Sequence, residues 1–391
     1  MPLLPKHSSV IPIQHNQDQV RLDRTRDRIL TMINTGERSR EMYTFAKKNM
    51  PNKVCLSPFV TANIDISGEV RLCNCGGWMW TNVGNLFLNT MKEILSSREA
   101  QLIRGSIADG SYLYCNEKTC GVINNNELND RHDPHGVPPR VQECLEDPTR
   151  FYMPTEIILA GDITCNLSCP SCRNSVIKVD DESLELYQDL GNKIRQNLFS
   201  EPTDDPMRLM LSTSGELFAS PMLLQMVNTI SVQDYPNLRL VLQSNGLLAP
   251  ARWHRLGDMQ DRVDSIVVTV DAARPETYEQ LRRGGRWEDI LSALEWLSDK
   301  KRENNMDFVI RMIVQQANYQ EMEEFWHLGQ QLGVDHVEYG RILNWQTYIE
   351  DNDDHFHKHD VFDPQHPEHK SAQHMLAHMK GFPRAKFWGG L

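Results

Sequence analysis

The run Ile163-Thr164-Cys165-Asn166-Leu167-Ser168-Cys169-Pro170-Ser171-Cys172 follows directly after an apolar, strand-like stretch, residues 156–160. Sulfur is a soft donor that favours iron–sulfur clusters, so three thiolates from one tight loop can bind three irons of a [4Fe–4S] cube. The fourth iron is then open to a substrate or cofactor. We therefore expect a reactive cluster at Cys165, Cys169 and Cys172. A zinc site with a fourth ligand from elsewhere in the chain is the alternative.

The spacing C-x3-C-x2-C after a strand resembles the signature of the radical S-adenosylmethionine (SAM) superfamily. In that family the open iron chelates the amino and carboxylate groups of SAM. One electron from the cluster then cleaves SAM into methionine and a 5′-deoxyadenosyl radical, which abstracts hydrogen. The resemblance implies an enzyme with a SAM-binding [4Fe–4S] cluster that takes electrons from an external donor such as flavodoxin or ferredoxin.

Length and composition limit the remaining choices. A chain of 391 residues with 40% hydrophobic residues suggests two to three globular domains. The formal net charge of −12 disfavours a nucleic-acid partner, because phosphate binding relies on clustered Lys and Arg. Nine cysteines, an odd number, argue against a complete disulfide framework and favour metal ligation. Residues 1–16 lack the apolar core of a signal peptide, and no later run reaches transmembrane length, so we expect no membrane association and a cytoplasmic location.

Composition shifts divide the chain into five segments. We expect an N-terminal helical segment (1–50), a small α+β iron–sulfur domain (51–125), a linker (126–153), a barrel (154–345) and a His/Asp-rich C-terminal extension or lid (346–391). Within these segments, residues 18–48 predict one or two helices. The alternating runs Val60–Ile66 and Val70–Leu72 predict a hairpin, and Met91–Ile103 predicts an amphipathic helix.

From residue 154 onward, strand-like runs alternate with helical patterns. The expected strands are 156–161, 208–213, 238–243, 264–270, 307–314 and 335–341. Repeated βα units with right-handed crossovers give a parallel sheet. We therefore predict an α/β fold, a partial (β/α)6 TIM-type barrel, which is also the fold that the resemblance implies.

Polar residues stand at the ends of these strands, where the loops of a barrel surround one mouth. Ser214-Gly215-Glu216 resembles the Gly-Gly-Glu motif of the family, which holds the SAM ammonium, although Ser214 replaces the first glycine. Ser244-Asn245 resembles its Thr-Asn-Gly motif, whose polar side chains can bind the carboxylate or ribose of SAM. The resemblance therefore implies a cofactor cradle formed by Ser214, Gly215, Glu216, Ser244 and Asn245.

Later strands end in charged residues that could line a catalytic cleft. The candidates are Asp271, Arg311 and Arg341. An aspartate after a strand is often a helix cap, and the arginines could instead form structural ion pairs. Relatives in the family carry a Tyr, an Arg-Gly pair and an aromatic after the strand that precedes Asp271, where the chain has Tyr278, Arg282, Arg283, Gly284, Gly285 and Trp287.

Four further cysteines precede the barrel: Cys55, Cys73, Cys115 and Cys120. Their arrangement around a hairpin, a helix and a late cysteine pair resembles the twitch domain, a shortened relative of the SPASM domain. That resemblance implies an auxiliary [4Fe–4S] cluster held by these four thiols. Cys75 could replace Cys73 as a ligand or be a spare buried thiol. A zinc ribbon is the alternative, because four thiolates also suit tetrahedral zinc.

The implied reaction is hydrogen abstraction from a substrate, with the auxiliary cluster assisting oxidation. No appended peptide-recognition domain is evident, which favours a small polar, sugar-like metabolite over a peptide. A peptide-modifying maturase of the RiPP type and a non-catalytic iron–sulfur or zinc-binding protein remain the alternatives. The histidines between 355 and 378 stand among aspartates and indicate a solvated tail rather than a metal site.

Overall fold

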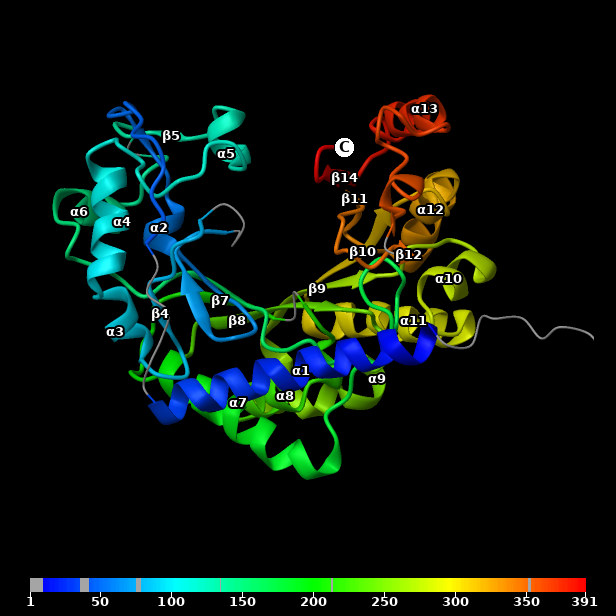
Figure 1. Ribbon diagram of the computed structural model, residues 1–391, viewed down its shortest axis with the longest axis horizontal. Coiled ribbons are helices and arrows are strands. Elements are labelled where there is room, and N and C mark those ends of the chain that lie inside the picture. Colours follow the sequence, from blue (N-terminus) through cyan, green and yellow to red (C-terminus); the bar gives the residue numbers. More distant parts are fainter. Residues whose placement is uncertain (1–9, 36–41, 75–78, 134, 212–213, 351–352) are drawn as a thin grey trace, which may run out of the picture.

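The computed structural model describes residues 10–35, 42–74, 79–133, 135–211, 214–350 and 353–391 (Figure 1). Cys75, named above as a substitute ligand, lies outside these residues. A ten-stranded sheet runs through the described part of the chain in the order β14-β11-β10-β9-β8-β7-β6-β2-β3-β4.

Six neighbouring strands of the sheet follow one another in chain order and are parallel. They are β6 (Glu156–Leu159), β7 (Met207–Leu211), β8 (Leu238–Ser244), β9 (Val263–Thr269), β10 (Asp307–Val314) and β11 (His336–Arg341). Each lies within one or two residues of its predicted bounds, and the expected α/β fold with a partial TIM-type barrel is confirmed.

Helices cover one face of these strands, as the βα alternation predicts (Figure 1). They are α7 (Leu184–Leu198), α8 (Pro221–Asn228), α9 (Ala249–Arg252), α10 (Pro275–Leu281), α11 (Trp287–Asn304) and α12 (Met322–Leu332). On β9, Ile266 and Val268 are fully buried in the core beneath these helices, whereas Thr269 points to the other face and lines a cavity. The open, inner face of the barrel is therefore available for a site.

The sheet continues beyond the barrel at both edges, which the sequence analysis did not predict. At one edge β2 (Thr61–Ile64) pairs in parallel with β6, and β3 (Glu69–Arg71) and β4 (Gly84–Asn85) follow. At the other edge β14 (Ala385–Trp388) pairs in parallel with β11. Figure 1 shows the resulting arrangement, with β2 to β4 at one end of the sheet and β14 at the other.

The hairpin predicted before residue 73 is confirmed by the antiparallel pair β2–β3. Gly68 adopts a φ of +80° in its turn, a conformation that glycine reaches without steric cost. The helix predicted over Met91–Ile103 is instead two helices, α3 (Met91–Leu95) and α4 (Arg98–Ala108). The break occurs because Ser97 caps α4, its hydroxyl accepting from the Ala100 amide 3.2 Å away.

The stretch expected as a linker, residues 126–153, contains regular structure in its described part. It contains β5 (Asn129–Asp130), which pairs with β1 (Lys53–Val54), and helix α6 (Pro139–Glu146). Two short helices, α2 (Ser57–Val60) and α5 (Gly121–Asn124), precede it in the chain. Pro139 occupies the first turn of α6, where proline is favoured. Val141, Cys144 and Leu145 then bury one face of α6.

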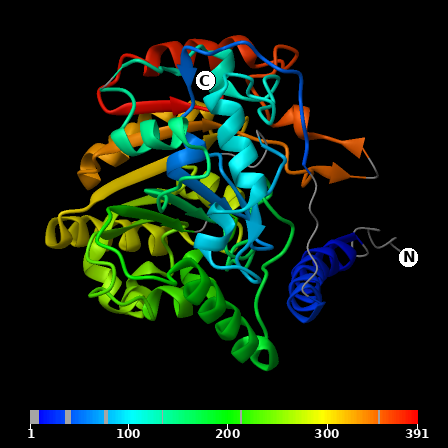
Figure 2. The ribbon, with the colours of Figure 1, turned by 90° about the vertical axis from the view of Figure 1, so that its left-hand side faces the viewer.

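Of the one or two helices expected over residues 18–48, the described residues contain one, α1 (Val10–Thr35), which begins and ends earlier in the chain. Leu22 and Ile29 of α1 are buried in the main core, and Arg28 pairs with Glu69 of β3 at 3.0 Å. Figure 2 shows α1 along one side of the molecule. Within the described residues, no helix is both long and apolar enough to cross a membrane.

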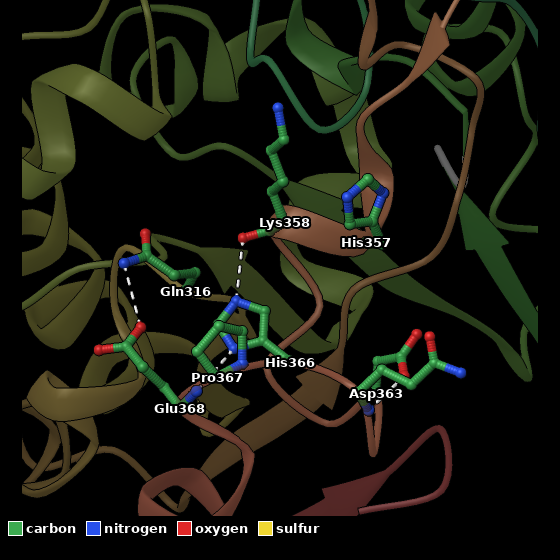
Figure 3. Close-up of a pocket in the computed structure, with 8 residues that line it drawn as sticks. Gln316, His357, Lys358, Asp363, His366, Pro367 and Glu368 are labelled. Atoms are coloured by element: carbon green, nitrogen blue, oxygen red, sulfur yellow. Dashed lines mark hydrogen bonds between the residues drawn. The ribbon is translucent and has the colours of Figure 1, made fainter.

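The C-terminal extension expected over residues 346–391 contains regular structure in its described part. It contains the short pair β12 (Ile349–Glu350) and β13 (Asp353–Asp354), helix α13 (His369–Met379) and strand β14. Its aromatic residues anchor it: Phe387 of β14 stacks on Tyr339 of β11 with ring centroids 5.4 Å apart. Figure 3 shows a further contact, in which the Gln316 and Glu368 side chains point toward each other across a pocket of about 500 Å³.

Candidate active site at the mouth of the barrel

A cavity of about 150 Å³ lies at the carboxyl ends of β6 to β9. All three cysteines of the opening motif line it, as do the five residues predicted to bind the cofactor: Cys165, Cys169, Cys172, Ser214, Gly215, Glu216, Ser244 and Asn245. Arg173, Gln243, Thr269 and Arg282 complete the polar lining. The structure thus brings together residues that are 80 positions apart in the sequence.

Backbone hydrogen bonds fix the cysteine loop. Cys165 forms an isolated antiparallel bridge with Ile177, which closes the loop at its base. The Cys172 amide donates to the Cys169 carbonyl at 3.0 Å, so these two residues form a tight turn. Ser168 exchanges two hydrogen bonds with Arg283, through its amide at 3.0 Å and its carbonyl at 2.8 Å. Arg283 therefore ties the loop to the segment that follows α10.

Two guanidinium groups lie beside the thiols. Arg173 donates to Cys172 Sγ at 3.4 Å and to the Ser214 carbonyl at 2.8 Å, and Arg282 donates to Cys169 Sγ at 3.6 Å. Burial raises the pKa of Cys165 to about 12, against the opposing field of Arg173. Thiols this buried lose their protons when positive charge or a metal stabilises the thiolate, and both arginines supply such charge. The sequence analysis missed Arg173, although a basic residue directly after three candidate thiolates was a usable signal.

Gly215 and Glu216 connect the ends of three strands. A Cβ atom on Gly215 would lie 2.7 Å from the carbonyl oxygens of both Asp162 and Thr164, so only glycine fits against the end of β6. The Glu216 amide donates to Thr164 O at 2.8 Å. The tight approach therefore occurs at Gly215, and the replacement of the preceding glycine by Ser214 leaves it intact.

The Glu216 carboxylate is fully buried and accepts three hydrogen bonds. The donors are Ser244 Oγ at 2.8 Å, the Asn245 amide at 2.6 Å and the Phe218 amide at 3.1 Å. Burial raises the pKa of Glu216, and these hydrogen bonds oppose that rise. Glu216 therefore lines the cavity and also holds the loops after β7 and β8 together.

Asn245 connects the loop after β8 to the cysteine loop. Its Nδ2 donates to Asn166 Oδ1 at 2.9 Å and approaches Cys165 Sγ at 3.9 Å. Asn166, which the sequence analysis did not single out, thus connects the first and third strand ends. Hydrogen bonds between neighbouring loops fix the whole cradle before any ligand binds.

Asp271 does not line the cavity but contacts Arg282, which does. Its carboxylate pairs with Arg282 at 2.9 Å and accepts from the Ile313 amide at 2.7 Å. Burial raises the pKa of Asp271, and Arg282 opposes that rise. Asp271 therefore orients Arg282, which in turn contacts Cys169. Arg282 Nε is buried and has no hydrogen-bond partner among the described residues.

The other two cleft candidates are engaged in ion pairs. Arg311 pairs with Glu338 of β11 at 2.6 Å and lies 5.3 Å from the ring centroid of Trp388. Burial acts to raise the pKa of Glu338, but His336 and Arg311 outweigh burial and lower this pKa to about 2. Arg341 pairs with Asp360 of the C-terminal segment at 2.6 Å. Neither arginine lines the cavity of the cysteine loop.

The four cysteines of the N-terminal region lie near one another. Burial raises the pKa of Cys115, and the neighbouring thiols Cys55, Cys73 and Cys120 raise it further. Among the described residues, no three Cys, His, Asp or Glu side chains converge closely enough to hold a single metal ion, and this includes both cysteine groups and the C-terminal histidines. A [4Fe–4S] cube differs from a single ion because each thiolate binds a different iron.

The donor set of the mouth cavity fits a SAM-binding cluster: three soft ligands, two neighbouring cations and a preformed polar cradle. Residues 163–328 match the family profile described as Radical SAM superfamily. The protein is an enzyme with a radical SAM domain, and that family implies SAM and a [4Fe–4S] cluster.

The solved structures that the chain matches share little sequence with it. Streptococcus suis SuiB bound to precursor peptide SuiA is 10% identical with a TM-score of 0.38, over 68% of this chain and 59% of that one. The anSMEcpe enzyme with bound AdoMet is 15% identical with a TM-score of 0.33, over 48% and 51%. A radical SAM methyltransferase from Sphaerobacter thermophilus is 14% identical with a TM-score of 0.31, over 58% and 63%.

The chain thus spans between half and two thirds of the length of these three proteins. Comparison with curated proteins gives no match.

Proposed function

We propose that the protein abstracts hydrogen from a small polar metabolite in a cavity between its two cysteine groups, and that an auxiliary cluster accepts the second electron. When bound, the SAM cluster supplies one-electron cleavage of SAM to methionine and a 5′-deoxyadenosyl radical. The chain's own residues hold the cysteine loop, balance its charge through Arg173 and Arg282, and present a polar cradle through Asn245 and Glu216.

The observation that carries this proposal is a second cavity of about 540 Å³. Cys55 and Leu128 of the N-terminal region form one wall, and Ile158 and Met210 on the inner face of β6 and β7 form the other. Met210 Sδ accepts a hydrogen bond from Gln243, which lines the cavity of the cysteine loop, at 3.5 Å. A molecule in the larger cavity would therefore lie between Cys55 and the SAM site.

The size and lining of this cavity favour a small molecule. Small-molecule sites typically enclose about 300–1,000 Å³ and combine apolar walls with a few polar groups. Here the charged groups are Glu127, Glu156 and Arg208. The contacts of Arg208 to Glu156 and Asp264 are long, 3.9 and 3.5 Å, so its guanidinium can also donate to a substrate hydroxyl. This lining suits a neutral or cationic hydroxylated metabolite better than a polyanion.

The auxiliary cluster is proposed at Cys55, Cys73, Cys115 and Cys120. Their mutual electrostatic influence supports it, because thiols that raise one another's pKa are close in space. Four thiolates would leave the cluster without an open iron, so its role would be electron transfer. The proposal also includes a cytoplasmic location and an external electron donor such as flavodoxin or ferredoxin.

Anaerobically reconstituted protein tests the proposal with SAM, dithionite and a panel of perdeuterated amino sugars, polyols and peptides. We expect deuterium to enter 5′-deoxyadenosine from a small hydroxylated compound. Arg208→Ala should reduce this transfer at least tenfold while leaving uncoupled 5′-deoxyadenosine formation unchanged. Arg239→Ala is the matched control, because Arg239 is the exposed register partner of Arg208 on β8 and lies outside the cavity.

Transfer from peptides alone would contradict the small-metabolite substrate and favour a peptide maturase. Absence of 5′-deoxyadenosine from protein with a full iron complement would contradict the cleavage itself.

A further inference from the structure

Arg173, which directly follows the cysteine loop, carries a positive charge into the interior of the protein. Only 7% of its surface is exposed. Its guanidinium donates to the backbone carbonyls of Ile163 and Ser214, the latter at 2.8 Å, and to Cys172 Sγ at 3.4 Å. These three contacts fix the guanidinium against the thiol, so the position of its charge relative to the cysteine loop is defined.

No carboxylate balances this charge by direct contact. Arg282 pairs with Asp271 at 2.9 Å, whereas Arg173 forms no ion pair in the part of the chain that the structure describes. Asp162 is buried nearby, but its carboxylate accepts hydrogen bonds from a neighbouring backbone amide at 2.9 Å and from Ser220 Oγ at 2.6 Å instead. A buried charge without a counter-charge is costly, so the thiols that Arg173 faces are the remaining source of negative charge.

A second buried arginine shows what the thiols contribute. Arg104 is 1% exposed and donates to the backbone carbonyls of Leu95 at 2.9 Å and Pro148 at 3.1 Å. Burial lowers the pKa of Arg104, as expected for a cation removed from water. Burial acts on Arg173 in the same direction, but the neighbouring thiols outweigh it and raise the pKa of Arg173. The two sites therefore differ in the negative charge that the cysteine loop can supply.

The charge of Arg173 would also act on a cluster held by this loop. An iron–sulfur cluster that takes up an electron becomes more negative, and its potential depends on nearby charge and on hydrogen bonds to its sulfurs. Arg282 donates to Cys169 Sγ at 3.6 Å, but the carboxylate of Asp271 offsets its charge. Among the described residues Arg173 has no such partner, so its field at the cluster is the stronger of the two.

We propose that Arg173 is the counter-charge of the SAM-binding cluster and raises its reduction potential, so that an external one-electron donor can reduce it. The cluster gains the electron that the donor loses, and no bond forms or breaks in this step. Arg173 is a positioning residue, because it acts through Cys172 and the cluster rather than on the substrate. The inference rests on the cluster that the radical SAM family implies at Cys165, Cys169 and Cys172.

A redox titration of reconstituted protein without oxygen tests the proposal. The protein is poised at a series of potentials with dithionite and redox mediators. At each potential the electron paramagnetic resonance signal that changes on addition of SAM is measured, because only a cluster with an open iron responds to SAM. Arg173→Gln should lower the ratio of reduced to oxidised cluster at a fixed potential about tenfold, which corresponds to about 59 mV for a one-electron couple. Arg173→Lys keeps the charge and should change this ratio less than about threefold.

Arg283→Gln is the matched control. Arg283 also hydrogen-bonds to the cysteine loop, through the Ser168 carbonyl at 2.8 Å, but it is exposed, so water screens its charge. This substitution should change the ratio less than about threefold, because it removes a loop contact without removing a buried charge. An effect as large as that of Arg173→Gln would overturn the proposal, because it would attribute the shift to a loosened loop.

Two further outcomes would overturn the role of charge: a natural potential in Arg173→Gln, or equal shifts in Arg173→Gln and Arg173→Lys. If Arg173→Gln retains no iron, the iron content of Arg173→Lys decides. A natural content supports the counter-charge, and a loss equal to that of Arg173→Gln overturns it. Absence of a SAM-responsive signal in the natural protein would instead contradict the cluster assignment, so the two failures are distinguishable.

Discussion

At the scale of single residues, the site depends on side chains that hydrogen-bond to one another and on Gly215, where no larger residue fits. The sequence analysis placed the motif residues at one mouth because they follow successive strands, and they do line one cavity. It could not predict that the Glu216 carboxylate accepts hydrogen bonds from Ser244 and Asn245, or that Arg173 contacts Cys172. Such contacts depend on how neighbouring loops pack against one another. The predicted cleft residue Asp271 acts on the cavity only through Arg282.

Gly215→Ala should reduce SAM binding at least tenfold. The added Cβ meets two backbone carbonyl oxygens at 2.7 Å, and neither can move without shifting the end of β6. Equilibrium dialysis of SAM against anaerobically reconstituted protein measures the effect. Gly105→Ala is the control: nothing lies within 4 Å of its Cβ, so the change should leave binding intact and stabilise helix α4 by about 0.5–1 kcal/mol. Unchanged SAM affinity in Gly215→Ala would contradict the close packing.

Arg282→Met should lower the free energy of unfolding of the apo-protein by about 3–5 kcal/mol. It leaves the buried carboxylate of Asp271 without its partner, and breaking a buried pair has a cost of this order. Urea denaturation measures the loss. Arg302→Met removes an exposed pair with Asp299 and should change stability by less than about 1 kcal/mol. Equal effects of the two substitutions would mean that the Asp271–Arg282 pair is not buried in solution.

At the scale of elements, the barrel strands were predictable because their buried faces require apolar runs of strand length. The interruption between α3 and α4 and the added edge strands β2 and β14 were not predictable. The Ser96-Ser97 interruption between α3 and α4 is a capping event inside a continuous amphipathic pattern. Strands β2 and β14 join the sheet through pairing with β6 and β11, from which they are far away in sequence, and no local pattern encodes such pairing.

The ion pair between β10 and β11 should make stability depend on pH in the acid range. The pKa of Glu338 falls from 4.5 to about 2 on folding, so its stabilising effect is complete above pH 4.5 and is lost as the pH falls toward 2. Glu338→Gln should therefore lower the free energy of unfolding at pH 7, with a difference from the natural protein that shrinks between pH 4.5 and 3. Urea denaturation across this range measures it, with the exposed Glu295→Gln on α11 as control. A pH-independent difference would contradict the shifted pKa.

At the scale of the whole molecule, the two cysteine groups should behave as separate metal centres. Cys169→Ala should abolish SAM cleavage while the protein retains the iron of the N-terminal cluster. Cys115→Ala should retain uncoupled cleavage but lose product formation. Iron and sulfide analysis of anaerobic protein should give a loss of about one cluster in each variant. Equal loss of cleavage in both would indicate that the N-terminal cysteines serve folding, and zinc in place of iron would favour a zinc ribbon there.

The parallel pairing of β2 with β6 has a practical consequence for anyone who dissects this protein. A fragment that starts at residue 154 would leave the edge of β6 bare, with backbone groups at Glu156–Leu159 ready to recruit a strand from another molecule. The barrel therefore cannot be separated at residue 154, the boundary that the sequence suggests, without exposing this edge. A chimaera that exchanges the front of the chain for that of a relative would have to import a replacement for Thr61–Ile64 in the same register, or the product would self-associate.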